Sequence, residues 1–527
     1  MSNLGFQTLY RLFNDLEVCA CERAFLPDKD ELREFEKSGE KLFSLESQTP
    51  LERFDIIAFS VSFEEDFINI PRILALAGVP LFSIERGRAH PLVMAGGCAV
   101  SLNPEPVAEF MDLCFIGEAE GMVGPFIEAV GEGGQGGEEG GLESLAGIEG
   151  VYVPALYEFT YDGPRVASIK AAPGAPERVT RARADTDLSP VPESVVLTPA
   201  TEFGSATLLE VERGCGRGCR FCAAGFIYLP PRMRELGPVK EIVERGFRES
   251  GKVGLVGAAV SEYPHLKELL RLGIEGGREM TLSSLRLDML DAELLDLLKK
   301  AGYRTVTLAP EAGTERLRRV VNKDISDSEI DEAIRLVKEA GFRKLKLYFM
   351  VGLPTETDAD ARAIGELSLR LKKLMGKGKL TLSINPFMPK PFTPFQWHPF
   401  ERVETIEKRY SIIKEMLKRE GGIDVKTLSV RKAFAQAYLS RADRRAGRVI
   451  AEASKVGLRR ALRSADHPAP LAEECVHRER GVDEPFPWEV VDHGLERGYL
   501  WDEYQRGLEG KTTPPCEVGS CFRCGVC

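Results

Sequence analysis

The sequence predicts an α/β protein with two successive series of βα repeats, followed by a mainly helical region that ends in cysteines. Short apolar runs alternate with helical patterns, which is typical of parallel sheets with crossover helices. A glycine-rich run at 131–141 interrupts this alternation, and the alternation restarts near Phe203. With 527 residues the chain is too long for a single hydrophobic core, so we expect several domains.

Residues 1–150 are predicted to form a doubly wound, flavodoxin-like parallel sheet. The expected strands are 55–62, 92–95 and 113–116. Ligands of such sheets sit beyond the carboxyl ends of the strands. Those ends carry Ser60, Ser62, Gly96, Gly97 and the segment 117–121. The acidic pair Glu118 and Glu120 lies in the last segment and can form a polar rim for a ligand.

The rest of the chain divides by composition. Residues 131–141 cannot bury apolar area, so we expect a flexible loop there, and the Pro- and Arg-rich stretch 151–202 is interpreted as a connector between domains. Residues 203–402 carry the second series of repeats. Its six expected strands are 207–212, 253–256, 280–284, 305–310, 344–350 and 380–385. Residues 403–510 are predicted to be mainly helical, and 511–527 form a cysteine-rich tail.

Composition and charge restrict the classes of function. The net charge of −11 argues against attraction of nucleic acid over the whole surface. The sequence contains no apolar stretch of membrane-spanning length and no secretory signal, so we expect a cytoplasmic protein with no membrane partner. Cysteines gather at 215–222 and 516–527, and clustered thiols in a cytosolic chain indicate metal binding rather than disulfides.

The most informative motif is formed by Cys215, Cys219 and Cys222, spaced CxxxCxxC at the end of an apolar run. Three thiolates so close together can hold three corners of one iron–sulfur cluster, and such clusters normally take four cysteines. One iron would then stay open to an outside ligand. Zinc is the competing interpretation, but its sites usually use CxxC pairs and a complete tetrahedral set. A disulfide fits poorly with a reducing compartment.

The spacing, the aromatic Phe221 before the last cysteine, and the strand-then-loop setting resemble the radical S-adenosylmethionine (SAM) superfamily. The resemblance implies a 4Fe-4S cluster held by Cys215, Cys219 and Cys222, with Phe221 beside the cofactor. It implies that the open iron chelates SAM. An electron from a donor such as flavodoxin or ferredoxin would then cleave SAM to a 5′-deoxyadenosyl radical. The six βα repeats would form an open, partial (β/α)6 barrel with its site at the carboxyl ends of the strands.

Gly257 closes the second strand of this series, where the superfamily carries a glycine-rich turn that contacts the SAM amino group. The third residue of that turn is usually acidic in the family, and here it is Ala259. Glu262 lies near enough in the sequence to replace the missing acid, or backbone carbonyls do so. The competing interpretation of Gly257 is an ordinary tight turn.

Ser283 and Arg286 follow the third strand, and Glu311 ends the fourth. The resemblance implies that these side chains bind the ribose and methionine parts of SAM, with Arg286 pairing with the SAM carboxylate. A structural ion pair is the competing interpretation of Arg286. Residues 352–357 resemble a GLPxET turn that shapes the adenine end of the site, and the proline-rich segment 385–397 suits a rigid loop at the substrate opening.

The order of segments resembles, over nearly the full length, radical SAM proteins with a cobalamin-binding-like N-terminal domain. The matching segments are 1–5, 21–25, 59–62, 103–106, 117–120 and the cysteine-rich end. Cobalamin domains carry a DxHxxG loop, which this chain lacks, and no histidine precedes His90. The chain begins at what resembles the loop after a missing first strand, so either the true start lies upstream or the domain lacks an edge. We expect either cobalamin bound without a protein nitrogen ligand or a domain without cobalamin that only closes the site.

The tail cysteines Cys516, Cys521, Cys524 and Cys527 form a second candidate metal site. Four thiolates at these spacings can hold a second iron–sulfur cluster or a structural zinc ion. The alternative is a frayed tail with free thiols. We expect metal, with iron–sulfur favoured over zinc.

Residues 431–463 carry a run of arginines and lysines of helical character. Such a run on an acidic chain can bind RNA, although a solvated helix face is the commoner explanation. The favoured function is a radical SAM enzyme that methylates, or inserts sulfur at, an unreactive carbon of an unknown substrate. The alternatives are an iron–sulfur, SAM-binding redox or sensor protein and an RNA-binding zinc protein.

Overall fold

The computed structural model describes residues 1–527 except 134–140, 188, 283–284 and 464–468. The chain forms two compact units, each assembled from segments that are not contiguous in the sequence. The sheet unit comprises Thr8–Asp185 and Ala435–Gly494, and the barrel unit comprises Met1–Gln7, Thr186–Phe434 and Leu495–Cys527. Both units contain parallel strands, and helices dominate after the last barrel strand, which confirms the predicted fold class.

The sheet unit is built on a four-stranded sheet whose strand order follows chain order. Its strands are β1 (Ile56–Ser60), β2 (Leu92–Gly96), β3 (Leu113–Phe115) and β4 (Val151–Tyr152). The first three are parallel, as the alternating apolar runs predict, and β4 pairs antiparallel with β3. Because β4 completes this sheet, the first part of the expected connector at 151–202 is part of the sheet unit.

Further elements of the sheet unit come from both halves of the chain. The helices include α3 (Asn69–Ala77), α4 (Cys98–Leu102), α5 (Val123–Gly133), α6 (Gly141–Ala146), α15 (Ala446–Val456), α16 (Leu458–Ala461) and α17 (Ala469–His477). The strands β5 (Tyr157–Asp162) and β6 (Arg165–Ala171) form an antiparallel hairpin. The strand β17 (Val491–Asp492) pairs with β7 (Val179–Thr180), which joins the C-terminal segment to the N-terminal one.

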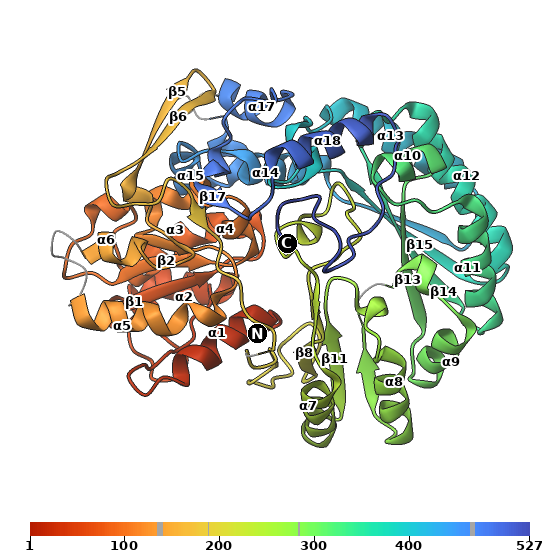
Figure 1. Ribbon diagram of the computed structural model, residues 1–527, viewed down its shortest axis with the longest axis horizontal. Helices are drawn as coiled ribbons and strands as arrows, with labels where there is room; N and C mark the ends of the chain where they lie inside the picture. The colour runs from red at the N-terminus through yellow and green to blue at the C-terminus, as the bar shows by residue number, and fades with distance from the viewer. Residues whose placement is uncertain (134–140, 188, 283–284, 464–468) are drawn as a thin grey trace. The chain divides into compact units, whose positions relative to one another are not determined.

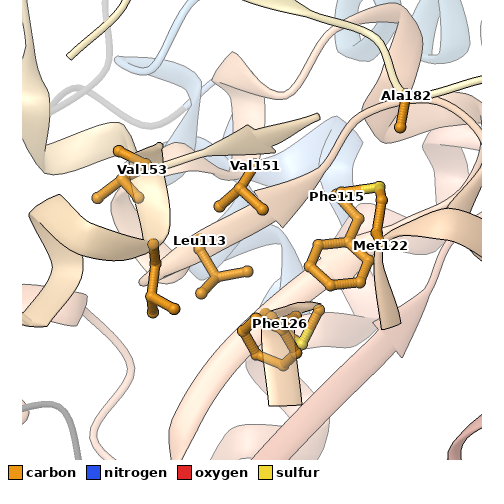
Figure 2. Packing of buried hydrophobic residues seen from close by; sticks show 10 residues of the cluster. Leu113, Phe115, Met122, Phe126, Val151, Val153 and Ala182 are labelled. Atoms are coloured by element: carbon orange, nitrogen blue, oxygen red, sulfur yellow. The ribbon is translucent and has the colours of Figure 1, made fainter. Parts of the chain in front are cut away.

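A cluster of buried apolar side chains holds α5 and α6 against the sheet (Figure 2). Phe115 of β3 and Phe126 of α5 meet edge to face, with their ring centroids 5.1 Å apart. Leu113 lies two residues before Phe115 on the same strand, so both side chains point to this covered face. Burying each of these side chains contributes about 1.5–3 kcal/mol. The packing fixes β3 and the loop that follows it.

The barrel unit has two parallel sheets among its described residues, one of three strands and one of four. They contain β8 (Thr207–Glu210), β11 (Lys252–Val256), β12 (Glu279–Thr281), β13 (Thr305–Glu311), β14 (Lys344–Val351), β15 (Lys379–Pro386) and β16 (Ile423–Thr427). All six expected strands are present. The strand β16 pairs with β15 in a stretch that the sequence predicted to be helical.

Helices lie on the outer side of these strands (Figure 1). They are α7 (Leu236–Glu249), α8 (Leu266–Glu275), α9 (Ala292–Lys300), α11 (Asp327–Glu339), α12 (Asp358–Met375) and α13 (Val403–Leu417). Local sequence sets the start of α11, because Ser326 and Glu329 form a reciprocal capping box. In β14 and β15 buried residues alternate with half-buried ones, so one face packs under the helices and the other faces the barrel interior. Among the described helices, none is both long enough and apolar enough to span a lipid bilayer.

Candidate functional site

The cysteines Cys215, Cys219 and Cys222 lie on the loop beyond the carboxyl end of β8 and the short strand β9 (Glu212–Arg213). Burial raises the pKa of Cys215 to about 11 and that of Cys222 to about 12, and the neighbouring thiol of Cys219 raises both further. Such thiols stay protonated alone, whereas a coordinating metal deprotonates them. In the described parts of the chain no three His, Cys, Asp or Glu side chains converge on one metal ion. Three cysteines at this spacing are the residues that would hold an iron–sulfur cluster with one open iron.

Arg220 fixes this loop from within. Its side chain is fully buried and lies between the cysteines in the sequence. The guanidinium donates to Glu503 of α18 (Arg497–Leu508) at 3.0 and 3.1 Å, and to the carbonyl oxygens of Arg319 and Val320 at 3.0 Å each. It also donates to the carbonyl oxygen of Lys511 at 2.7 Å. The nitrogens of this one guanidinium therefore hold the loop against three other segments.

Charged side chains surround Cys219. Burial raises the pKa of its thiol, while the cations Lys323 and Arg286 lower it and the carboxylate of Glu311 raises it. The Nζ atom of Lys323 donates to Glu311 at 3.0 Å. Glu311 ends β13 with φ 69°, a left-handed conformation that is uncommon for a residue other than glycine. The structure thus brings the predicted residues Arg286 and Glu311 to the cysteine loop and adds Lys323, which the sequence analysis missed.

Arg286 lies in a network of ion pairs. Its Nε is 3.0 Å from Glu262 and its Nη2 donates to Asp288 at 2.8 Å. Glu262 also accepts from Arg217 of the cysteine loop at 2.7 Å. Glu262 therefore joins two arginines here, and the ion pair considered as the competing interpretation of Arg286 is present. Ser283 lies outside the described residues, and Phe221 is half-buried.

Glu212 occupies the place expected for an acid at the Gly257 turn. A Cβ atom on Gly257 would come within 2.4 Å of the Glu212 side chain, so only glycine leaves room for it. The Glu212 carboxylate accepts a hydrogen bond from the backbone N–H of Ala259. Burial raises the pKa of Glu212 to about 7, and the carboxylates of Glu262 and Glu210 add to the effect. The signal in the sequence that could have identified Glu212 is its position, since it is an acid directly before the cysteine motif, at the end of an apolar strand.

Two further predicted segments are held by contacts with buried side chains. In the turn after β14, buried Glu356 accepts from the backbone N–H groups of Gly352 and Leu353 and pairs with Arg409 at 2.8 Å. Burial raises the pKa of Glu356 to about 7. In the segment 385–397, Trp397 is fully buried and stacks with Tyr504 of α18, their ring centroids 6.1 Å apart. The aromatic contact connects the segment 385–397 to α18, and the rigidity predicted for this segment stays a prediction.

The cysteine-rich tail contacts the cysteine loop directly. The backbone N–H of Cys516 donates to the carbonyl oxygen of Gly216 at 2.6 Å. Asn322 donates to the carbonyl oxygens of Gly218 and Thr513 at 3.1 and 3.2 Å, and so joins loop and tail. Within the tail, burial and the three other tail thiols together raise the pKa of Cys516 to about 11, so these thiols lie within electrostatic reach of Cys516. The sequence separates these two cysteine groups, and the fold brings them together.

At the carboxyl edge of the sheet unit, glycines pack against the chain's own backbone. A Cβ atom on Gly97 or Gly117 would come within 2.5 or 2.2 Å of a backbone oxygen, and both have positive φ. The oxygen next to Gly117 belongs to Ala182. The buried Glu118 accepts from the backbone N–H of Ala184 at 2.9 Å. Gly97, Gly117 and Glu118 therefore pack against the backbone of the sheet unit itself, and the presence of cobalamin at this edge stays a prediction.

The basic run 431–463 is not one solvated helix face. Arg441 is only 1 % exposed, Arg444 pairs with Glu105 at 2.8 Å, and Arg445 pairs with Asp443 at 2.7 Å. The exposed basic residues of the run are Arg431, Lys432, Arg448, Lys455, Arg459, Arg460 and Arg463. The arginines in the middle of the run therefore make contacts within the sheet unit, and Arg441 and Arg445 also line a pocket there.

Comparison with known proteins identifies the family. The profile "Radical SAM proteins, N-terminal" matches residues 5–154, and the profile "Radical SAM superfamily" matches residues 209–368. The uncharacterised protein MJ0966 of Methanocaldococcus jannaschii is 32% identical over 407 residues, which are 76% of this chain and 81% of that protein. The chain therefore belongs to the radical SAM superfamily. It is an enzyme, and its family uses SAM and a 4Fe-4S cluster.

Other similarities are more partial. The tRNA-2-methylthio-N(6)-dimethylallyladenosine synthase of Cereibacter sphaeroides is 27% identical over 236 residues, 41% of this chain and 50% of that protein. The cytidylyl-2-hydroxyethylphosphonate methyltransferase of Streptomyces wedmorensis is 25% identical over 178 residues, 32% of this chain and 33% of that protein. Among solved structures, the radical SAM methyltransferase TsrM from Kitasatospora setae aligns with a TM-score of 0.49 and 15% identity, over 97% of this chain and 94% of that one.

Proposed function

We propose that this enzyme binds SAM at a cluster held by Cys215, Cys219 and Cys222 and functionalises an unreactive carbon, by sulfur insertion in preference to methylation. The observation that carries the proposal is the cysteine loop itself. It lies beyond the carboxyl end of a barrel strand, is locked by the buried Arg220, and has Arg286, Lys323 and Glu311 around its central thiol. Barrel enzymes place their chemistry at this end of the strands.

The residues around the loop have complementary roles. When bound, the cluster supplies the electron that cleaves SAM. Arg286 and Lys323 provide positive charge for the SAM carboxylate. Glu212 of β9, whose side chain reaches the turn after the second barrel strand, provides the carboxylate for the SAM ammonium group, in place of the acid missing at Ala259. A cationic ligand group there would favour the ionised form of Glu212, whose pKa is about 7 without it.

Sulfur insertion is favoured because a second set of thiols lies beside the first. The tail cysteines Cys516, Cys521, Cys524 and Cys527 are neighbours, and Cys516 is hydrogen-bonded to the cysteine loop. We propose that they hold a second iron–sulfur cluster, with a flavodoxin or ferredoxin as electron donor to the enzyme. A tRNA-2-methylthio-N(6)-dimethylallyladenosine synthase among the partial relatives supports sulfur insertion, and makes an RNA substrate one candidate. The methyltransferase relative supports methylation as the second candidate function.

The test uses anaerobically reconstituted enzyme whose sulfide carries a heavy sulfur isotope, together with SAM labelled with deuterium in its methyl group. Reduced enzyme should form 5′-deoxyadenosine. Incubation with the small-molecule and RNA fractions of a cell extract, followed by mass spectrometry, should yield a product that carries heavy sulfur. Transfer of the deuterated methyl group without heavy sulfur would favour methylation. Absence of 5′-deoxyadenosine from enzyme with a full iron content would refute the proposal.

A further inference from the structure

A pocket of about 320 Å³ lies in the sheet unit, and nothing in the proposed function uses it. Its volume is in the range of small-molecule sites. Arginines dominate the lining: Arg165, Arg441, Arg445, Arg448, Arg478 and Arg480. Three acids also line it: Glu109, Asp443 and Glu484. The pocket is therefore cationic within a chain whose net charge is −11.

Two of the arginines are neutralised inside the pocket wall. Arg445 pairs with Asp443 at 2.7 Å, and Arg478 donates to Glu484 at 2.7 Å. Burial raises the pKa of Glu109, the remaining acid, so it is a weak counter-ion. The other arginines give the pocket its excess of positive charge.

Arg480 is a buried positive charge of the pocket with an unused donor. Its residue is 7% exposed, and its guanidinium packs 4.9 Å from the ring centre of Trp488 and 5.4 Å from that of Phe486. One of its nitrogens donates to the carbonyl oxygen of Arg441 at 3.1 Å. Its Nε atom is buried and makes no hydrogen bond to any described residue. A buried donor left unsatisfied costs about 1–3 kcal/mol, more when charged, so an acceptor that enters the pocket would be stabilised there.

The fold holds these guanidiniums in place. The rings of Phe486 and Trp488 stack with their centroids 4.8 Å apart, which gives Arg480 a fixed platform. At the mouth of the pocket, Arg448 of α15 and Arg165 of β6 are exposed. A ligand that enters would meet exposed cations first and a buried cation further in. The planar guanidinium fork donates two parallel hydrogen bonds to the oxygens of a phosphate or carboxylate group.

We propose that this pocket binds a small phosphate ester, with its phosphate group on the arginine-lined side. A small molecule fits better than a nucleic-acid backbone because Arg480 is buried, whereas a polymer would contact the exposed cations of the run equally. All the lining residues belong to the sheet unit, whereas Cys215, Cys219 and Cys222 belong to the barrel unit, so phosphate binding can be measured separately from SAM cleavage. The site would give the enzyme a means of holding a phosphorylated substrate or effector.

The test measures binding of ribose 5-phosphate, ribose and inorganic phosphate to the full-length, cluster-loaded enzyme by isothermal titration calorimetry. Ribose 5-phosphate and inorganic phosphate should bind saturably, and ribose should not. Arg448→Glu at the pocket mouth should weaken phosphate binding by about tenfold or more, since it removes one charge-assisted contact and adds repulsion. Arg459→Glu is the matched control, because it makes the same charge change on an exposed residue that does not line the pocket. That control should change the affinity by less than about twofold, because salt screens distant charges.

Three outcomes would overturn the proposal. One is an absence of saturable binding of either phosphate probe to the unmodified enzyme. Another is an equal loss of affinity in Arg448→Glu and Arg459→Glu, which would indicate only a diffuse positive field. The third is tighter binding of a single-stranded RNA than of ribose 5-phosphate, with both substitutions weakening the RNA binding equally. That result would indicate that the basic run 431–463 binds nucleic acid.

Discussion

The carboxyl of Glu212 offers a sharp test of how the SAM site is built. It is 4% exposed and sits in the space left by Gly257, accepting from the backbone N–H of Ala259. The substitution Glu212→Gln keeps the size of the side chain and an oxygen that can accept the same hydrogen bond. It removes only the ability to ionise. A pH-dependent difference in stability between the two proteins therefore reports the burial of this one acid.

The size of the effect follows from its pKa. Burial raises the pKa of Glu212 from 4.5 to about 7. Each tenfold change in proton affinity corresponds to about 1.4 kcal/mol, so the protonated carboxyl contributes roughly 3 kcal/mol to stability. Because the pKa is raised in the folded state, this contribution is complete below pH 4.5 and is lost as pH rises through about 7. The glutamine variant keeps its stability over the same interval, so it should become the more stable protein at neutral and alkaline pH.

The assay is differential scanning calorimetry of cluster-free protein at several values between pH 5 and pH 8. The melting temperature of wild type should fall with pH relative to that of Glu212→Gln. The control is Glu279→Gln, which removes the charge of a carboxylate with 76% of its side chain exposed and should follow wild type. A constant difference between wild type and Glu212→Gln at every pH would refute the reasoning, because it would mean that Glu212 ionises equally in the folded and unfolded chains.

Three further predictions concern the cysteine groups and their support. Cys219→Ala should abolish 5′-deoxyadenosine formation in an anaerobic assay while circular dichroism stays unchanged, since two thiolates cannot retain the cluster and the strands do not depend on it; residual product would contradict the assignment. The pair of changes Cys521→Ser and Cys524→Ser should lower the iron content by about four atoms per chain, that of one cubane cluster; loss of one zinc ion instead would make the tail structural. Arg220→Met should lower the free energy of unfolding by about 3–5 kcal/mol because it leaves Glu503 charged and buried. Adding Glu503→Gln should recover part of that loss in thermal melts, and no recovery would show that the ion pair is not its cause.

Much of the fold could be predicted from local patterns. The six expected barrel strands are present because each is a short apolar run between helical repeats, a signal that depends only on neighbouring residues. The strand β16 was missed because its burial pattern places no residue fully inside, so it lacks the apolar run that marks the other strands. Local patterns also could not predict that residues 435–494 belong to the sheet unit, because this depends on long-range contacts such as the pairing of β17 with β7.

The candidate site shows the same division between local and long-range information. The cysteine motif could be found because its residues are close in sequence. Arg286 and Glu311 lie near Cys219 because both follow barrel strands, whose carboxyl ends converge, and their roles in SAM binding stay predictions. Glu212 and Lys323 were missed, because their roles depend on which side chain fills the space beside Gly257 and which cation reaches Glu311. Both contacts depend on how the side chains pack in the folded structure.

The hydrogen bonds of Arg220 also order events during synthesis of the chain. The residues that this buried arginine contacts in α18 and at Lys511 lie 283 and 291 positions further along the chain, and Cys516, which bonds to the cysteine loop, follows them. During synthesis the cysteine motif therefore leaves the ribosome before these partners do. The loop gains its full set of hydrogen bonds only once residues 503–516 have been made, so a cluster inserted earlier would enter a loop that lacks this support.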